Sequence, residues 1–145
     1  MLIGQSELAI DKTGQLTLPP NYCEAFKEGA FLTMGFDRNL LLLPSEEFQN
    51  MLRYISSLSI TDPLARSLLR FLLGNAIELN MDNENQINIP KNLLEFAGIE
   101  QDIIAIGQGE YSELWAPRFW KKQIQILQHP DANNDRFASL FIAVV

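Results

Sequence analysis

The chain has 145 residues, 47% of them hydrophobic and 20% charged, which supports a folded core and excludes a disordered chain. Its formal net charge of −7 repels polyanions at long range, so any surface for nucleic acid must be local. The single cysteine, Cys23, excludes an internal disulfide and fits a cytosolic protein. We expect neither a signal peptide nor a membrane span, which would need about 20 consecutive apolar residues.

The first half of the chain predicts short strands, turns and helices. Strands are indicated by alternation of apolar and polar residues, and turns by Asp and Gly. Helix starts are indicated by residues that cap well. In chain order we expect a strand over 2–10, a turn over 11–14, a strand over 16–18, a helix over 21–28 capped by Asn21 and closed by Gly29, a hairpin of 31–34 and 40–43 around 35–39, and a helix from its cap Ser45 to Ile55.

A longer helix is predicted between the two halves. Asp62 is a good N-cap and Pro63 suits the first helical position, and Gly74-Asn75 ends the pattern. Its leucines form a broad apolar arc that we expect to be buried: Leu64, Leu68, Leu69, Leu72 and Leu73.

The second half repeats the order of the first. We expect a strand over 76–81, a turn over 82–85, a strand over 87–89, a helix over 92–97 closed by Gly98, a hairpin of 102–106 and 112–115, and a helix over 117–127. After a polar stretch, residues 137–145 are apolar, and we expect them to pack on the core or on a neighbouring subunit.

An internal repeat explains this parallel. Asp11–Pro19 returns as Asp82–Pro90, with Asp, Gln and Pro at identical spacing and an offset of 71 residues (82 minus 11). A repeat dictates architecture. We therefore divide the chain into a first repeat (1–58), a bridging helix (59–75), a second repeat (76–128) and a tail (129–145).

The repeated stretch resembles the signature of the MraZ family of bacterial transcriptional regulators, relatives of the AbrB-type swapped-hairpin barrel. That signature is Asp-x-x-x-Arg followed by an aliphatic-x-aliphatic-Pro run. The resemblance extends to Leu32–Gly35, to the helix segment Ala65–Ala76, and to Ile104–Gly107 with Glu113–Trp115. It covers residues 1 to about 125.

The resemblance implies an α+β fold, a pseudo-twofold AbrB/MraZ-like double-split β-barrel built from the two repeats, with peripheral helices. It also implies a homo-oligomeric ring in the cytoplasm and nucleoid that binds double-stranded DNA at direct repeats upstream of the division and cell-wall gene cluster. The DNA-binding residues expected from the two loops are Asp11, Lys12, Gly14, Gln15, Asp82, Asn83, Asn85 and Gln86.

The chain departs from the family signature at its arginines, because Gln15 and Gln86 stand in their places. Arginine is a charged bidentate fork for guanine or phosphate, whereas glutamine can read adenine but releases no counterions. The formal charge of the two loops is −2, from Asp11, Asp82 and Glu84 against Lys12. Two alternatives therefore stay open: a regulator that reads different DNA, or an oligomeric scaffold that has lost DNA binding and binds a protein partner. Some local positive charge is available from Lys91, Arg66 and Arg70.

Other interpretations of these residues are plain structural ones. Asp11 and Asp82 also suit turn-bracing roles, and the two glutamines suit solvated strand starts. Cys23 fits a buried, inert thiol. The lone His129 lies in no Cys or His cluster, and the carboxylates form no acid–base set. We therefore expect no enzyme, no metal or cofactor, and no small-molecule substrate.

Overall fold

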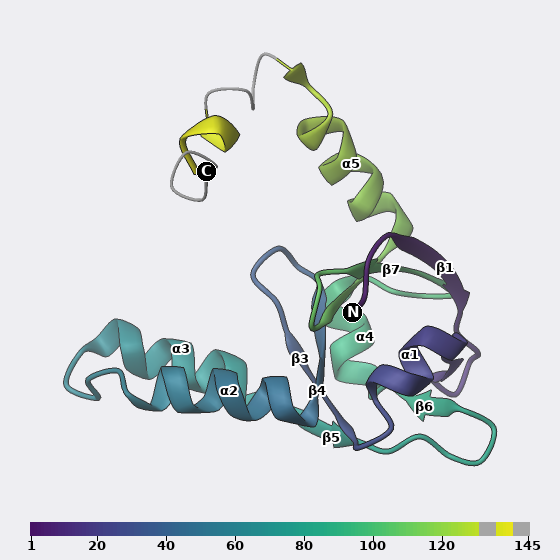
Figure 1. Ribbon diagram of the computed structural model, residues 1–145, viewed down its shortest axis with the longest axis horizontal. Coiled ribbons are helices and arrows are strands. Elements are labelled where there is room, and N and C mark those ends of the chain that lie inside the picture. The colour runs from purple at the N-terminus through teal and green to yellow at the C-terminus, as the bar shows by residue number, and fades with distance from the viewer. Residues whose placement is uncertain (131–135, 141–145) are drawn as a thin grey trace.

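The computed structural model describes residues 1–130 and 136–140 (Figure 1). Its strands and helices alternate in the order that the sequence predicts. In chain order they are β1 (Gln5–Ala9), β2 (Gln15–Thr17), α1 (Pro20–Ala25), β3 (Ala30–Met34), β4 (Leu40–Pro44), α2 (Ser45–Ser56), α3 (Pro63–Gly74), β5 (Ile77–Leu79), β6 (Gln86–Asn88), α4 (Lys91–Ala97), β7 (Asp102–Gly107), β8 (Ser112–Trp115) and α5 (Pro117–Leu127).

The strands form a six-stranded antiparallel sheet in the order β1-β7-β8-β4-β3-β5, and a separate two-stranded ribbon of β2 and β6. The strands β1, β3 and β4 of the first repeat correspond to β5, β7 and β8 of the second. When each strand is replaced by its counterpart, the same strand order is obtained in reverse, so the sheet has a pseudo-twofold symmetry. The registers agree with this exchange. Leu16 lies opposite its counterpart Ile87 in the ribbon, and Leu41 lies opposite Glu113 at the centre of the sheet. Neither repeat therefore completes the sheet alone.

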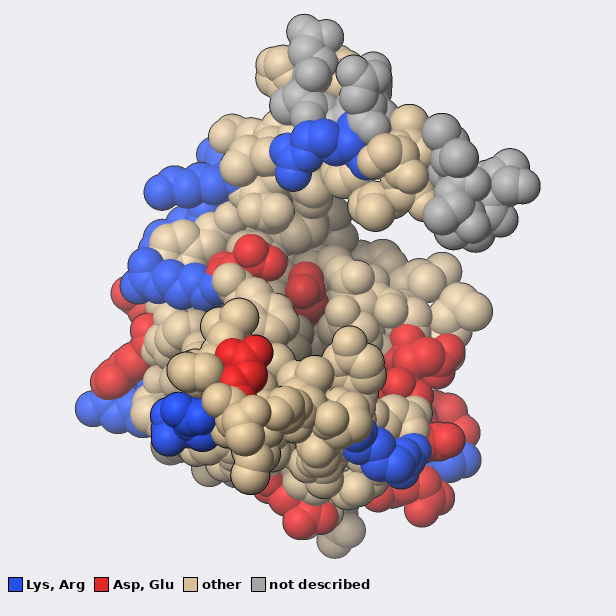
Figure 2. Space-filling model, turned by 90° about the vertical axis from the view of Figure 1, so that its left-hand side faces the viewer, with Lys and Arg blue, Asp and Glu red and all other residues tan. Residues whose placement is uncertain are grey.

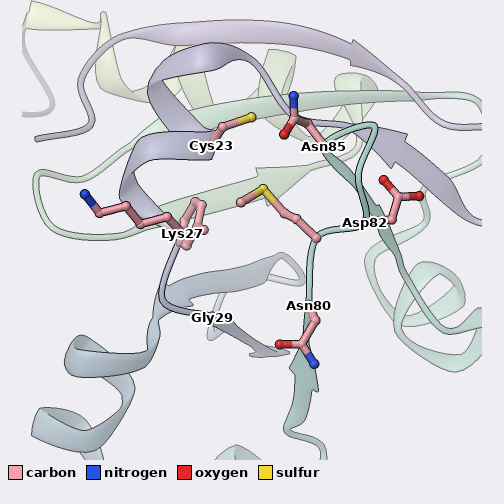
Figure 3. A pocket seen from close by; sticks show the side chains of 8 residues that line it. Cys23, Lys27, Gly29, Asn80, Asp82 and Asn85 are labelled. Atoms are coloured by element: carbon pink, nitrogen blue, oxygen red, sulfur yellow. The ribbon is translucent and has the colours of Figure 1, made fainter.

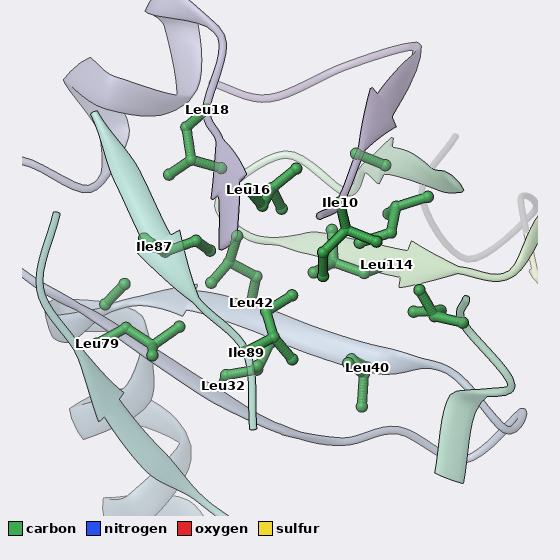
Figure 4. Packing of buried hydrophobic residues seen from close by; sticks show 14 of the residues in the cluster. Ile10, Leu16, Leu18, Leu32, Leu40, Leu42, Leu79, Ile87, Ile89 and Leu114 are labelled. Atoms are coloured by element: carbon green, nitrogen blue, oxygen red, sulfur yellow. The ribbon is translucent and has the colours of Figure 1, made fainter. Parts of the chain in front are cut away.

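The core lies between the ribbon and the sheet (Figure 4). Alternate residues of each ribbon strand point inward, as the period-two pattern predicts. Leu16 and Ile87 are 1% and 2% exposed, and they pack in one cluster with Leu32 and Leu42 of the sheet. The short helices close this core with side chains that are also buried: Tyr22, Phe26, Leu93 and Ala97.

A buried hydrogen bond joins the repeats. The Tyr22 hydroxyl of α1 lies 2.8 Å from the Ser112 hydroxyl of β8. Ser112 also donates to the Ile106 carbonyl at 3.1 Å, so both buried hydroxyls have partners, as burial requires. Burial raises the pKa of Tyr22 above its ordinary value, which keeps the hydroxyl protonated.

Two of the predicted helix caps are wrong and one is confirmed. The caps of α1 and α2 are Pro19 and Pro44, without a side-chain hydrogen bond. Asn21 therefore lies inside α1, and Ser45 begins α2 while its hydroxyl donates to the Glu28 carbonyl. A proline at this place fixes the extended backbone that a cap needs. Asp62 does cap α3, since its carboxylate accepts from the Leu64 N–H at 2.9 Å.

The apolar arc of α3 is less buried than the sequence predicts. Helices α2 and α3 lie side by side and project from the sheet (Figure 1), so one side of the pair has no sheet to cover it. Only Ala65 and Leu72 of α3 are buried, and Leu64 is 76% exposed.

The predicted packing of the tail is not seen in its described part. Phe137 and Leu140 are 46% and 71% exposed, so these two side chains do not enter the core of this chain. The rest of that prediction falls on residues 131–135 and 141–145, which lie outside the described residues.

No helix among the described residues is long and apolar enough to cross a membrane.

Candidate nucleic-acid interface

The first of the two repeated turns is held by the Asp11 carboxylate. Its Oδ1 accepts hydrogen bonds from the Thr13 hydroxyl at 2.7 Å and from the backbone N–H groups of Thr13 and Gln15 at 2.9 Å each. These bonds, the Thr13 hydroxyl first, lower the pKa of Asp11, because they favour the charged form. The turn-bracing role considered for Asp11 is thus present in the structure.

The second turn repeats this arrangement. Asp82 Oδ1 accepts from the N–H groups of Glu84 and Gln86 at 2.9 Å each. Each turn closes with a residue in the left-handed region, Gly14 at φ +89° and Asn85 at φ +61°. Asparagine tolerates this region better than most residues, which explains how Asn85 takes the place in the second turn that Gly14 has in the first.

Gly14 is also needed because the backbone of the opposite strand lies very close to its Cα. It is buried, and a Cβ there would lie 2.5 Å from the Ile89 carbonyl oxygen. That contact exists because each turn binds the strand of the other repeat. The Ile89 N–H donates to the Gly14 carbonyl at 2.8 Å, and the Leu18 N–H donates to the Asn85 carbonyl at 2.9 Å. Gly14 therefore shapes the turn and has no side chain to offer a ligand.

The ribbon between the turns presents a polar outer face. Gln15 lies opposite Asn88, and Thr17 lies opposite Gln86, all four on the side away from the buried Leu16 and Ile87. Of these, Gln15, Thr17 and Asn88 are exposed, and Gln86 is half-buried. The Gln86 amide approaches the Thr17 hydroxyl at 3.4 Å. The Asn88 amide, oriented with its nitrogen inward, donates to the Thr13 and Gly14 carbonyls at 2.9 and 3.1 Å.

The structure places the predicted residues along the ribbon and in the turns at its two ends. The two turns lie at opposite ends of the ribbon, about 13 Å apart for four residue steps. Sequence reasoning missed Thr17 and Asn88 as members of the outer face, although the period-two pattern contained this signal. The predicted residues that are exposed on this surface are Asp11, Lys12, Gln15, Asp82, Asn83 and Asn85.

Additional positive charge near the turns is limited. Lys91, directly after the second repeated Pro, lies 3.8 Å from Glu95, and the Arg66 guanidinium donates to the Ile60 carbonyl on the α2–α3 pair. On the face at the free ends of α2 and α3, basic and acidic side chains are interspersed (Figure 2). Basic charge near the turns also comes from Lys12 in the first turn and from Lys27, which lines a pocket with Asp82 and Asn85. The outer face of the ribbon itself carries neutral polar side chains.

A pocket of about 300 Å³ opens beside the second turn (Figure 3). Cys23 of α1 and Lys27, two residues after α1, lie on one side, and Asn80, Asp82 and Asn85 lie on the other. Cys23 was expected to be buried, but it is half-buried and lines this pocket. Its thiol donates to the Leu18 carbonyl at 3.3 Å.

Within the described residues there is no group of three or more His, Cys, Asp or Glu side chains that could hold a metal ion. Trp115 is buried and packs edge-on against Trp120, with ring centroids 5.4 Å apart. This agrees with the structural role that aromatic residues most often have.

The fold and the site together define a two-repeat α+β protein whose paired Asp-anchored turns flank an exposed polar ribbon. A model of the family described as "MraZ protein, putative antitoxin-like" matches residues 1–71 and 72–140. The chain is 37% identical over 127 residues to a protein of Thermomicrobium roseum, covering 88% of this chain and 89% of that protein. It is 36% identical over 138 residues to a protein of Roseiflexus sp. strain RS-1, covering 95% and 94%. It is 32% identical over 144 residues to one of Dictyoglomus thermophilum, covering 97% and 99%. All three relatives carry the name "Transcriptional regulator MraZ". The chain belongs to the MraZ family.

Proposed function

We propose that this protein is a transcriptional regulator that binds double-stranded DNA with the outer face of the β2·β6 ribbon and its two turns. The observation that carries this proposal is the ribbon itself: two antiparallel strands with a buried apolar side and an exposed polar side, between matched turns. The name of the relatives supports it. The proposed role needs no catalytic step and no cofactor.

A two-stranded β-ribbon fits the major groove of B-DNA, which is about 12 Å wide. Gln15 and Gln86 stand on the outer face, and a glutamine amide can bond adenine N6 and N7 bidentately. Lys12, Asn83 and Asn85 lie in the turns at the ribbon ends, where they can reach phosphates. Asp11 and Asp82 act indirectly, because their Oδ1 atoms are engaged within the turns.

The finer parts of the proposal follow from family membership. The target would be direct repeats upstream of the division and cell-wall gene cluster, and the protein would work in the cytoplasm and nucleoid as a ring of identical subunits. The fold would be the double-split, swapped-hairpin barrel, with repeats at 1–58 and 76–128, a bridging helix at 59–75 and a tail at 129–145. The symmetric strand pairing of the two repeats supports this barrel.

The test restores the missing charge. The double variant Gln15→Arg/Gln86→Arg should bind the DNA upstream of its own gene more tightly than wild type in fluorescence anisotropy. The plot of log affinity against log salt should steepen by about 0.9 for each phosphate newly neutralised. The matched control, Gln49→Arg/Gln128→Arg, adds the same charge at exposed positions outside the ribbon, so it should change binding less. An equal effect of both variants would mean that the ribbon is not the binding face. Wild-type protein that binds no DNA at low salt would favour a scaffold that binds a protein partner.

A further inference from the structure

Helix α5 carries basic side chains on one side and no acidic ones. Arg118, Lys121 and Lys122 have the i, i+3 and i+4 spacing that places residues on one face of a helix, and all three are exposed. The helix contains no Asp or Glu, although the chain as a whole has a net charge of −7. Its counterpart in the first repeat, α2, has two glutamates and one arginine. Helix α5 is therefore a local positive surface on an acidic protein.

The apolar side chains of α5 are only partly covered. Phe119, Trp120 and Ile124 are half-buried where the helix packs against β7. Ile126 and Leu127, at its end, are 55% and 40% exposed. No residue of α5 is fully buried, whereas α2, which lies beside α3, buries two. Figure 1 shows the end of α5 directed away from the sheet, so basic and aliphatic side chains are presented together there.

The aromatic rings of α5 are engaged with the body of the protein. The Trp120 indole N–H donates to the Gln5 side-chain oxygen at 3.1 Å, and its ring packs edge-on against Trp115. The guanidinium carbon of Arg38 lies 4.6 Å from the centre of the Phe119 ring. These contacts fix the first half of the helix on the sheet, and they leave aliphatic rather than aromatic side chains at its exposed end.

We propose that α5 binds the surface of an anionic lipid membrane. The helix would lie along that surface, with Lys121 and Lys122 at the lipid phosphates and with Ile126 and Leu127 at the boundary of the acyl chains. Basic residues on one side and apolar residues on the other are the composition of helices that bind membrane interfaces. A nucleic acid would use the same lysines, but its bases stack on aromatic rings, and exposed aliphatic side chains add nothing to such contacts. The end of α5 therefore favours lipid over nucleic acid.

The charge distribution of the chain also orients it on such a surface. An anionic membrane attracts the helix, and it repels the acidic remainder of the protein wherever that comes within a Debye length of about 10 Å. Two further exposed apolar side chains, Phe137 and Leu140, follow α5 in the chain, and they can add apolar contact on the same side. The inference depends neither on DNA binding nor on self-association.

The test measures co-sedimentation of the purified protein with lipid vesicles, in the absence of DNA. One set of vesicles is an equal mixture of phosphatidylglycerol and phosphatidylcholine, and the other is phosphatidylcholine alone. Variant A, Lys121→Glu/Lys122→Glu, reverses the basic charge of α5. Variant B, Ile126→Gln/Leu127→Gln, keeps the charge and removes the aliphatic side chains. Circular dichroism checks that each variant is folded.

The matched control for variant A is Arg53→Glu/Arg70→Glu. It changes the net charge by the same amount at exposed positions of α2 and α3. If α5 is the binding surface, the control should bind anionic vesicles nearly as well as wild type does.

Wild type should bind the anionic vesicles and not the phosphatidylcholine vesicles. Variant A should bind about 25-fold more weakly or worse, because each basic residue near an anionic surface contributes about 5-fold. Variant B should bind about 10-fold more weakly, because its polar side chains gain nothing from the acyl boundary.

Three results would each overturn the inference: no binding of wild type to anionic vesicles, an equal loss in variant A and its control, or undiminished binding of variant B. If wild type ignores vesicles and variant A loses affinity for DNA, α5 is a nucleic-acid surface instead. Because the vesicle assay contains no DNA, its failure leaves the proposed function of the ribbon unaffected.

Discussion

The close approach of Gly14 to the opposite strand gives a prediction that the structure quantifies. In Gly14→Ala the new Cβ would meet the Ile89 carbonyl oxygen at 2.5 Å, and the residue would keep φ +89°. A left-handed conformation costs an alanine about 1–2 kcal/mol. Displacing Ile89 weakens its bond to the Gly14 carbonyl, which adds about 1–2 kcal/mol. The free energy of unfolding should fall by about 2–4 kcal/mol, and Tm by roughly 4–16 °C.

Two other glycines separate these contributions. Gly4 has φ +80° and open space around its Cβ position, and Gly74 has open space without a positive φ. Urea unfolding of the three alanine variants at one protein concentration should show a loss of about 1–2 kcal/mol for Gly4→Ala, from backbone strain alone. Gly74→Ala should be neutral or stabilising by up to about 1 kcal/mol. If Gly14→Ala were no less stable than Gly4→Ala, the close approach of the turn to the opposite strand would be refuted.

Three further predictions follow from the same contacts. Leu16→Ala, at a side chain only 1% exposed, should lower the free energy of unfolding by about 2–5 kcal/mol in urea titration; a smaller loss would mean that the ribbon is not packed on the sheet. Asp11 has a pKa lowered from its ordinary 3.8, so its stabilising contribution is complete above that value and is lost as pH falls through the lower, folded value. The fall in Tm below about pH 4 should therefore be smaller in Asp11→Asn, and an unchanged acid profile would contradict the bracing role. Tyr22→Phe should cost about 1 kcal/mol in thermal unfolding, because it removes one partner of Ser112; no loss would mean that the buried pair does not link the repeats.

Much of the fold was predictable from the sequence because the repeat carries strong local signals. Asp11 and Asp82 mark turns, prolines end the ribbon strands, and Asp62 marks the start of α3. These signals act within a few residues of the chain. The failed caps at Asn21 and Ser45 show the limit of this reasoning, since a preceding proline took the cap position in both cases.

The parts that were not predictable depend on long-range arrangement. The exposure of Leu64 depends on α2 and α3 projecting from the sheet, which helical periodicity does not report. The Asn88 amide can donate to the Thr13 and Gly14 carbonyls only because β6 pairs with β2 across the repeats. The contact of both Arg38 and Arg118 with the Phe119 ring joins residues far apart in sequence.

The central claim is that the polar face of the ribbon binds DNA, and one measurement tests it most directly. Fluorescence anisotropy would compare wild type with Gln15→Ala/Gln86→Ala on the DNA upstream of the gene and on scrambled DNA, at two salt concentrations. We predict that wild type prefers the upstream DNA and that the variant loses this preference, since each lost bidentate contact is worth about 1–3 kcal/mol. A variant that keeps the wild-type affinity and preference would contradict the account.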